Sequence, residues 1–204
     1  MTVRKILPVS ILYLLFLNSC IDSNEEYYKD LTAYRKEINI MFSDSTTSPL
    51  PKEDLLHFKG LEFFPVDPAY SIEADFQITP GSETFKMPMS KERIVWYRKY
   101  GVAKFTLKGK ELSLAVYQNQ DLVKKEGYED YLFLPFKDLT NGIETYGGGR
   151  YIDLRIPDGD KILIDFNKAY NPYCAYNYKY SCPIPPDENH LQVEIKAGVL
   201  DYEH

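Results

Sequence analysis

Short segments of alternating apolar and polar residues, separated by turn signals, constrain this chain most strongly from residue 61 onward. In YSIEADFQI (70–78) every second residue is apolar, so one face of an extended strand would be buried. AKFTL and LSLAVYQ flank a bend around Gly109, which predicts a hairpin. Further strands are expected at YLFLPF, YIDLRI, KILIDF and LQVEIKAG. We therefore predict a mainly β fold, either an antiparallel β-sandwich or a partly open barrel.

Two of these strands carry more specific predictions. Pro135 interrupts YLFLPF, and because proline lacks a backbone N–H, we expect this strand to lie at an edge or to end there. YIDLRI and KILIDF flank the turn signal PDGD, which predicts that they pair as a hairpin. In the register that places their apolar residues on one face, Leu154 lies opposite Ile162 and Ile152 opposite Ile164.

One helix is expected before the strands. IDSNEEYYKDLTAYRKEINIMF (21–42) has one apolar stripe with helical spacing, and Asn24 is a suitable cap. A linker with serine, threonine and proline follows, and KED after Pro51 suggests one more helical turn. The expected organisation is a signal peptide over residues 1–19, a helix and linker over 20–57, a β domain over 58–198 and a tail over 199–204.

The N-terminus indicates export. Arg4 and Lys5 precede an apolar stretch of about a dozen residues, which is shorter than the roughly 20 residues needed to span a bilayer. LNSC, ending at Cys20, resembles a bacterial lipobox and implies cleavage before Cys20 with lipid attached to that cysteine. A plain signal peptide and a membrane helix near the start are the alternatives. We expect a lipid-anchored protein of the cell envelope, with the outer membrane favoured.

Charge and cysteine content narrow the partners further. Removal of residues 1–19 leaves 22 basic and 30 acidic residues, a formal charge of −8, which makes nucleic acid a poor partner. Besides Cys20 the chain has Cys174 and Cys182, for which an oxidising compartment favours a disulfide; two free buried thiols are the alternative. No metal site or cofactor is expected, because no CxxC or nearby histidine pair completes a ligand set.

The stretch from Phe133 onward is dense in glycine, asparagine, proline and tyrosine. It contains DLTNGIETYGGGR (138–150) and DFNKAYNPYCAY (165–176), followed by CPIPPDENHL (182–191). These runs resemble a bacterial family known only as domain of unknown function 1684, and GLEFFPVDP (60–68) resembles the start of its domain. The resemblance covers roughly residues 58–198. It carries no activity, and His190 stands where the family pattern has an arginine.

The glycine run Gly147–Gly149 has two interpretations. Successive N–H groups of a glycine loop can hold an anion, with Arg150 beside it. However, GGGRY lacks the lysine and hydroxyl of a P-loop, and a strand rather than a helix follows it. A bend in which glycine supplies a positive φ is favoured. The tyrosines over residues 170–180 either stiffen their loop or offer stacking surfaces to a ligand.

Two functions are considered. In the first, the β domain binds a glycan, a peptide or a partner protein through the face shared by the glycine run and the tyrosine-rich loop. In the second, the protein hydrolyses envelope or imported glycans, with the carboxylates of Glu144 and Asp165 as acid and base near Arg150. No nucleophilic triad is evident, so no catalytic residue is assigned beyond these two. The expected binding residues are Tyr146, Arg150, Asp165, Asn167, Tyr170 and Asn171.

Overall fold

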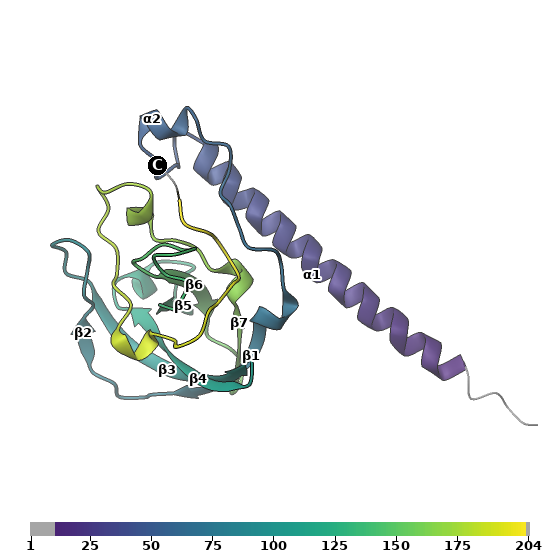
Figure 1. Ribbon diagram of the computed structural model, residues 1–204. Coiled ribbons are helices and arrows are strands. Elements are labelled where there is room, and N and C mark those ends of the chain that lie inside the picture. Colours follow the sequence, from purple (N-terminus) through teal and green to yellow (C-terminus); the bar gives the residue numbers. More distant parts are fainter. Residues whose placement is uncertain (1–10, 203–204) are drawn as a thin grey trace, which may run out of the picture. The chain divides into compact units, whose positions relative to one another are not determined.

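The computed structural model describes the backbone of residues 11–202 and the side chains of residues 25–202. It divides into two compact units, residues 1–38 and 39–204. The second unit contains one curled antiparallel sheet of seven described strands (Figure 1). The partly open barrel is therefore confirmed. The strands are β1 (Ser71–Ile78), β2 (Thr84–Lys86), β3 (Trp96–Leu107), β4 (Lys110–Asn119), β5 (Tyr131–Phe136), β6 (Arg150–Arg155) and β7 (Lys161–Asp165).

The predicted helix is present and longer than expected. Helix α1 runs from Ile11 to Ser43, so Asn24 lies inside it and does not cap its start. From residue 25 onward the residues of the predicted stripe are buried or half-buried, and Leu31 is fully buried. The predicted signal peptide and the lipobox at Cys20 lie outside the residues whose side chains are described. In the described part of the chain, no helix has both the length and the apolar character needed to cross a membrane.

Short helices occupy the loops. The predicted extra turn is α2 (Lys52–Leu55), which begins after Pro51 as expected. Single 3₁₀ turns follow before β1, between β4 and β5, and after β7. Their bounds are η1 (Pro68–Tyr70), η2 (Leu122–Lys124), η3 (Phe166–Lys168), η4 (Tyr173–Ala175) and η5 (Asp187–Asn189).

The strand order of the sheet is β6-β5-β4-β3-β1-β7, with β2 paired to β3 beside this path. The predicted hairpin around Gly109 joins β3 and β4, whose register pairs Leu107 with Lys110. The two loop residues Lys108 and Gly109 have φ values of 50° and 75°. A two-residue loop with both φ values positive matches the right-handed twist of the strands it joins.

Of the two alternatives for the strand that contains Pro135, the edge position is wrong, whereas the strand does end beside this residue, at Phe136. Strand β5 lies between β4 and β6 and is buried on both faces. Leu132 and Leu134 belong to the main core, whereas Phe133 belongs to a second apolar cluster on the opposite face. A strand buried on both sides needs apolar residues at successive positions, which explains why YLFLPF does not alternate.

A central proline is tolerated because β4 and β5 pair at a single position, Tyr117 with Phe133. Beyond it, the side chain of Asn189 is inserted between the two strands. Its Oδ1 accepts from the N–H of Ala115 at 2.7 Å, and its Nδ2 donates to the carbonyls of Ala115 and Pro135 at 2.8 and 2.7 Å. The amide thus takes the place of a neighbouring peptide group, in a stretch where proline has no donor to offer.

The predicted hairpin of YIDLRI with KILIDF is also wrong. Strand β6 pairs with β5, and β7 pairs with β1, so the two are the opposite ends of the strand order. The bend between them is instead held by neighbouring strand ends, through bonds from Ile156 N–H to Asp130 and from Phe76 N–H to Asp160. The predicted core face is nevertheless right, because Ile152, Leu154, Ile162 and Ile164 all lie in the main core.

The last predicted strand, LQVEIKAG, is extended but has no strand partner. In Figure 1 this C-terminal segment (yellow) carries no arrow. The predicted alternation of buried and exposed positions is confirmed. The main core contains Leu191, Val193, Ile195 and Ala197, and the residues between them are exposed. Its backbone bonds partly to the backbone of other loops, at Leu191 and Val193, and partly to side chains, among which Arg150 makes the most bonds.

Candidate functional site

Arg150 is the first residue of β6 and is fully buried. Its Nη2 donates to Asp138 and to the carbonyl of Ile195, both at 2.8 Å, and its Nη1 donates to the carbonyls of Ala197 and Val199. Carbonyls at alternate positions of an extended chain point the same way, so one guanidinium serves three of them. Arg150 therefore fixes the C-terminal segment, and it is not exposed to a ligand.

The acidic partner of Arg150 is Asp138, whereas Asp165 makes other contacts. The carboxylate of Asp138 is buried and accepts from Thr140 N–H at 2.8 Å and from Ile195 N–H at 3.2 Å, besides Arg150. Burial lowers the pKa of Arg150, while the charge of Asp138 acts in the opposite direction. Because arginine stays protonated in proteins, this is a buried ion pair that depends on both partners.

The glycine run before Arg150 is a tight bend, as favoured. The N–H of Gly149 donates to the carbonyl of Tyr146 at 3.1 Å, and the φ of Gly149 is +94°. A Cβ on Gly149 would lie 2.6 Å from the carbonyl oxygen of Phe136, and one on Gly148 would lie 2.2 Å from the ring of Tyr146. Glycine is required because the chain passes its own backbone and the Tyr146 ring so closely.

The two carboxylates proposed as acid and base have structural contacts. Glu144 forms an ion pair with Lys196 at 3.1 Å. Asp165 is buried and caps η3, accepting from the N–H and the Nδ2 of Asn167 at 3.0 and 3.1 Å. Neither contact prepares a carboxylate for proton transfer.

The two expected asparagines also face inward. Asn167 is fully buried and pairs with the backbone of Asp67 through both ends of its amide, at 3.1 and 2.8 Å. Asn171 is 1% exposed and donates to the carbonyl of Leu200 at 2.8 Å. Both asparagines join segments that are distant in the sequence, so their presence in the motif is explained by a structural role.

Of the expected binding residues, Tyr146 and Tyr170 remain partly exposed. The hydroxyl of Tyr170 donates to Oδ1 of Asp153 at 2.6 Å, and the hydroxyl of Tyr131 donates to the same atom at 2.7 Å. Asp153 is exposed on β6 opposite Phe133 of β5, and Tyr131 lies two residues earlier on that strand. Both bonds use Oδ1, so the outer oxygen Oδ2 carries no bond to the described residues.

Two further rings lie in the loop that follows Tyr170. Tyr173, whose side chain is 42% exposed, packs against Tyr180 with ring centroids 5.3 Å apart. Burial raises the pKa of Tyr173, and the neighbouring Tyr180 and then Asp153 raise it further. We call Tyr131, Asp153, Tyr170, Tyr173 and Tyr180 the tyrosine–carboxylate site.

The hydroxyl of Tyr131 remains protonated. Burial raises the pKa of Tyr131, and the adjacent charge of Asp153 raises it further, because a second negative charge beside a carboxylate is unfavourable. The tyrosines therefore act as hydrogen-bond donors that fix the orientation of Asp153. Beneath them, Tyr97, Phe133 and Tyr151 belong to the apolar cluster on the outer face of the sheet, which makes the support rigid.

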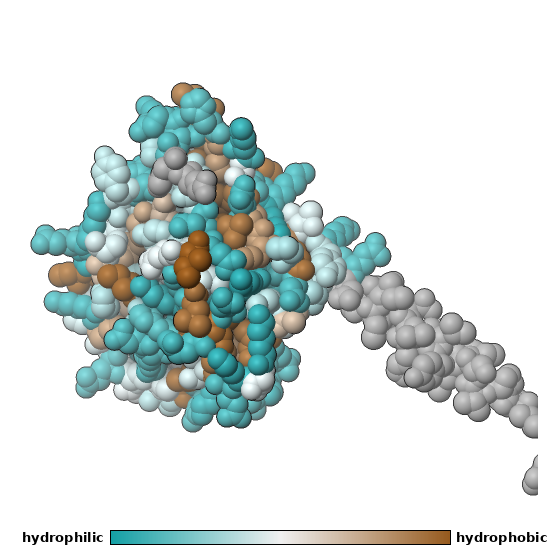
Figure 2. Space-filling view, in the orientation of Figure 1, coloured by the Kyte–Doolittle hydropathy of each residue, from teal (hydrophilic) through white to brown (hydrophobic). Residues whose placement is uncertain are grey.

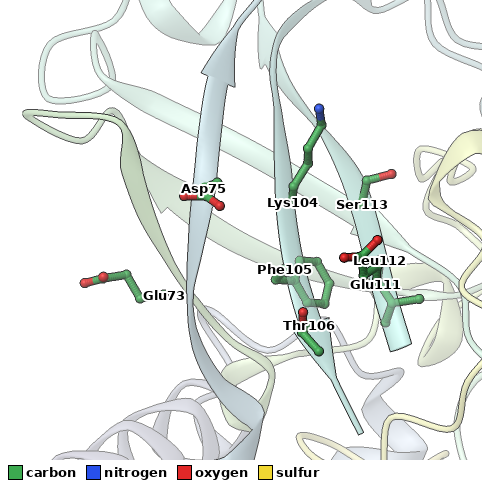
Figure 3. A pocket seen from close by; sticks show the side chains of 8 residues that line it. All are labelled: Glu73, Asp75, Lys104, Phe105, Thr106, Glu111, Leu112 and Ser113. Carbon is green, nitrogen blue, oxygen red and sulfur yellow. The ribbon is translucent and has the colours of Figure 1, made fainter. Parts of the chain in front are cut away.

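Two grooves elsewhere on the sheet make weaker candidates. One, of about 620 Å³, lies over β1, β3 and β4, and Figure 3 shows Glu73 directed away from the other side chains that line it. The other, of about 540 Å³, contains Glu188, whose two oxygens are already engaged by Tyr117 and Lys99. Among residues 25–202 no group of three or more His, Cys, Asp or Glu side chains is arranged to hold a metal ion.

The expected disulfide is not formed, since Cys174 and Cys182 are both free thiols in this structure. They lie close together: the N–H of Cys174 donates to the sulfur of Cys182 at 3.2 Å. The hydroxyl of Tyr146 is 3.7 Å from the sulfur of Cys174. The glycine bend thus delivers Tyr146 to the cysteines, a contact that the sequence alone did not suggest.

Residues 56–200, which include most of the residues described above, match the family described as "Protein of unknown function (DUF1684)". The chain belongs to this family. It is also similar to an uncharacterised protein of Haloarcula marismortui whose structure was determined by NMR in solution. The two are 36% identical, the match covers 90% of this chain and 99% of that one, and the TM-score is 0.70. No curated protein matches the chain.

Within this DUF1684 chain, the motif residues have two kinds of role. Asp138, Arg150, Asn167 and Asn189 are buried and bind the backbone of distant segments. Tyr170 of the second motif is partly exposed and bonds instead to Asp153, which the motif pattern does not include. What could have pointed to Asp153 is its position on the outer face of YIDLRI, between the buried Ile152 and Leu154.

Proposed function

We propose that this chain is a lipid-anchored protein of the cell envelope whose β domain binds neutral glycans at the tyrosine–carboxylate site. The observation that carries the proposal is the exposed carboxylate of Asp153, held by two tyrosine hydroxyls through one oxygen. The second oxygen can accept hydrogen bonds from the hydroxyls of a sugar, and a charged acceptor makes such bonds strong.

The rings beside Asp153 support the same ligand class. A sugar presents hydroxyls at its rim and C–H groups on its faces, so it suits a carboxylate flanked by flat aromatic rings. Tyr173 and Tyr180 provide such rings, and tyrosine offers a large contact area at a low cost in conformational entropy. The formal charge of −8 after residue 19 argues against acidic glycans and for neutral ones.

The test is binding of the purified full chain to a panel of neutral hexasaccharides with α- and β-linkages, measured by calorimetry. Asp153→Asn keeps the shape of the side chain and removes its charge. A hydrogen bond to a charged group contributes about 1.5–3 kcal/mol, so the dissociation constant should rise about 10- to 100-fold. Asp158→Asn, an exposed carboxylate in the bend after β6, is the matched control and should leave binding unchanged.

Failure of every sugar to bind, or equal affinity in Asp153→Asn and the unmodified chain, would reject the glycan. Binding of a peptide or protein instead, with the same loss in Asp153→Asn, would keep the site and change the ligand class.

The anchor rests on the sequence LNSC and the apolar stretch before it. Cys20→Ala removes the sulfur to which the acyl chains would be attached. Each methylene of an acyl chain contributes about 0.8 kcal/mol to membrane binding, so the variant should move from the membrane fraction to the soluble fraction. Cys182→Ser serves as the control. Retention of Cys20→Ala in the membrane would show that another segment is responsible.

A further inference from the structure

Cys174 and Cys182 form a second cluster whose chemistry glycan binding does not use. Cys182 is buried and Cys174 is partly exposed, so a reagent from solution reaches the sulfur of Cys174 first. The sulfur of Cys182 accepts from the backbone N–H of Cys174 at 3.2 Å, which holds it within the reach of its neighbour. This is the arrangement of an attacking thiol with a second thiol behind it.

The backbone around Cys182 is firmly held. Its N–H donates to the hydroxyl of Ser90 at 2.9 Å, and its carbonyl accepts from the N–H of Ser90 at 2.9 Å. Met89 and Pro183 form a β-bridge beside it, and Ile184 N–H donates to Pro88 at 2.8 Å. A fixed second thiol next to a more accessible first one favours closure of a disulfide once the first has reacted.

We propose that Cys174 and Cys182 are a reversible dithiol–disulfide pair in which Cys174 attacks and Cys182 resolves. The hydroxyl of Tyr146, 3.7 Å from the sulfur of Cys174, donates to its thiolate form. Tyr146 is therefore a positioning residue, and the glycine bend exists in part to bring it there.

The electrostatics agree with this division of roles. Hydrogen bonds from the Cys182 thiol, and then from the hydroxyls of Tyr146 and Ser90, lower the pKa of Cys174 to about 6, although burial acts in the opposite direction. The same contact and burial raise the pKa of Cys182. At neutral pH, Cys174 is then the thiolate and Cys182 the thiol, and the thiolate is the reactive form.

Other charged and titratable groups face this pair from neighbouring segments. Arg93 lies near Cys182, where its charge favours the thiolate. The hydroxyl of Tyr151 of β6 donates to the carbonyl of Pro183, the residue after Cys182, and burial raises its pKa. Asp201 of the C-terminal segment acts on Tyr146, whose own pKa is raised mainly by burial and then by the contact with Cys174.

The reaction is thiol–disulfide exchange with a disulfide of a small thiol or a protein. The thiolate of Cys174 attacks one sulfur of this oxidant, whose S–S bond breaks and releases one thiolate. Cys182 gives its proton to that leaving group and attacks the sulfur of Cys174, which releases the second thiolate; this takes up a proton from water. The two protein thiols lose two electrons to the oxidant, which is reduced to two thiols.

The first test equilibrates the purified full chain with mixtures of oxidised and reduced glutathione and maps the cysteines by alkylation and mass spectrometry. A Cys174–Cys182 disulfide should appear as the ratio rises and disappear as it falls. Cys182→Ser should accumulate glutathione on Cys174. A pair that stays fully oxidised or fully reduced at every ratio would overturn the proposal, and so would glutathione accumulating on Cys182 in Cys174→Ser as readily as on Cys174.

The second test measures the rate of alkylation of Cys174 as a function of pH in the Cys182→Ser variant. The serine hydroxyl of this variant preserves a hydrogen-bond donor to Cys174. The half-maximal rate should fall well below pH 8.5, the value for a free cysteine. Adding Tyr146→Phe should shift this midpoint upward and slow alkylation at pH 6 several-fold, while the rates at pH 9 converge. Tyr178→Phe, an exposed tyrosine of the same loop, should shift nothing. A midpoint near 8.5, or equal shifts in the two tyrosine variants, would contradict the assignment.

Discussion

Arg150→Met is expected to lower the free energy of unfolding by about 3–5 kcal/mol, the range for breaking a buried ion pair at one partner. Methionine is similar in length, so the change removes charge and hydrogen bonds more than volume. It leaves the carboxylate of Asp138 buried without its cation, and it removes the donors to Ile195, Ala197 and Val199. Urea denaturation of the full chain measures the loss.

Arg155→Met is the matched control on the same strand. Arg155 is 54% exposed and pairs with Asp130 at 2.6 Å, so its loss should cost under about 1 kcal/mol. Asp138→Asn added to Arg150→Met should recover part of the stability, because it removes the buried and unpaired charge of the Asp138 carboxylate. Equal losses in Arg150→Met and Arg155→Met would show that the buried pair does not hold the C-terminal segment.

Asn189→Ala should cost about 3 kcal/mol or more. It leaves the N–H and carbonyl of Ala115 and the carbonyl of Pro135 without this hydrogen-bond partner. Each unsatisfied buried group costs about 1–3 kcal/mol. Amide hydrogen exchange should show the loss locally, with Ala115 exchanging much faster because its N–H has no other partner. The same denaturation experiment gives the total.

The control for Asn189 is Asp187→Ala, which lies in the same short helix with its side chain fully exposed. It should change the stability by no more than about 0.5 kcal/mol. If Asn189→Ala proved as mild as Asp187→Ala, the amide would not be the element that joins β4 to β5, and tolerance of Pro135 would need another cause.

The sequence predicted the parts of the fold that depend on local pattern. The β3–β4 hairpin, the core faces of β6 and β7 and the extended C-terminal segment all followed from alternation and turn residues. Pairing between distant segments did not follow. PDGD predicts a bend, but it does not indicate whether the flanking strands pair with each other or with β5 and β1. Both arrangements bury Ile152 and Ile164 equally well.

The sequence indicated the region of the chain in which the candidate site lies, but it did not identify the residues that form the site. Arginine after a glycine run and asparagine in a motif suggest ligand binding, yet Arg150, Asn167 and Asn189 are buried and replace missing backbone partners. Only the tertiary structure decides this, since the carbonyls that they serve lie far along the chain. Conversely, Asp153 becomes a candidate only through its bonds to Tyr131 and Tyr170, and these three residues come from separate segments that meet when the sheet folds.

The most direct test of the proposed site is NMR chemical-shift mapping of the ¹⁵N-labelled full chain during titration with the neutral hexasaccharide that binds best. The account predicts that the perturbed amides centre on residues 131, 153 and 170–180, on the outer face of β5 and β6. Perturbations centred on the groove lined by Glu73, Asp75 and Glu111, with Asp153 unaffected, would contradict it.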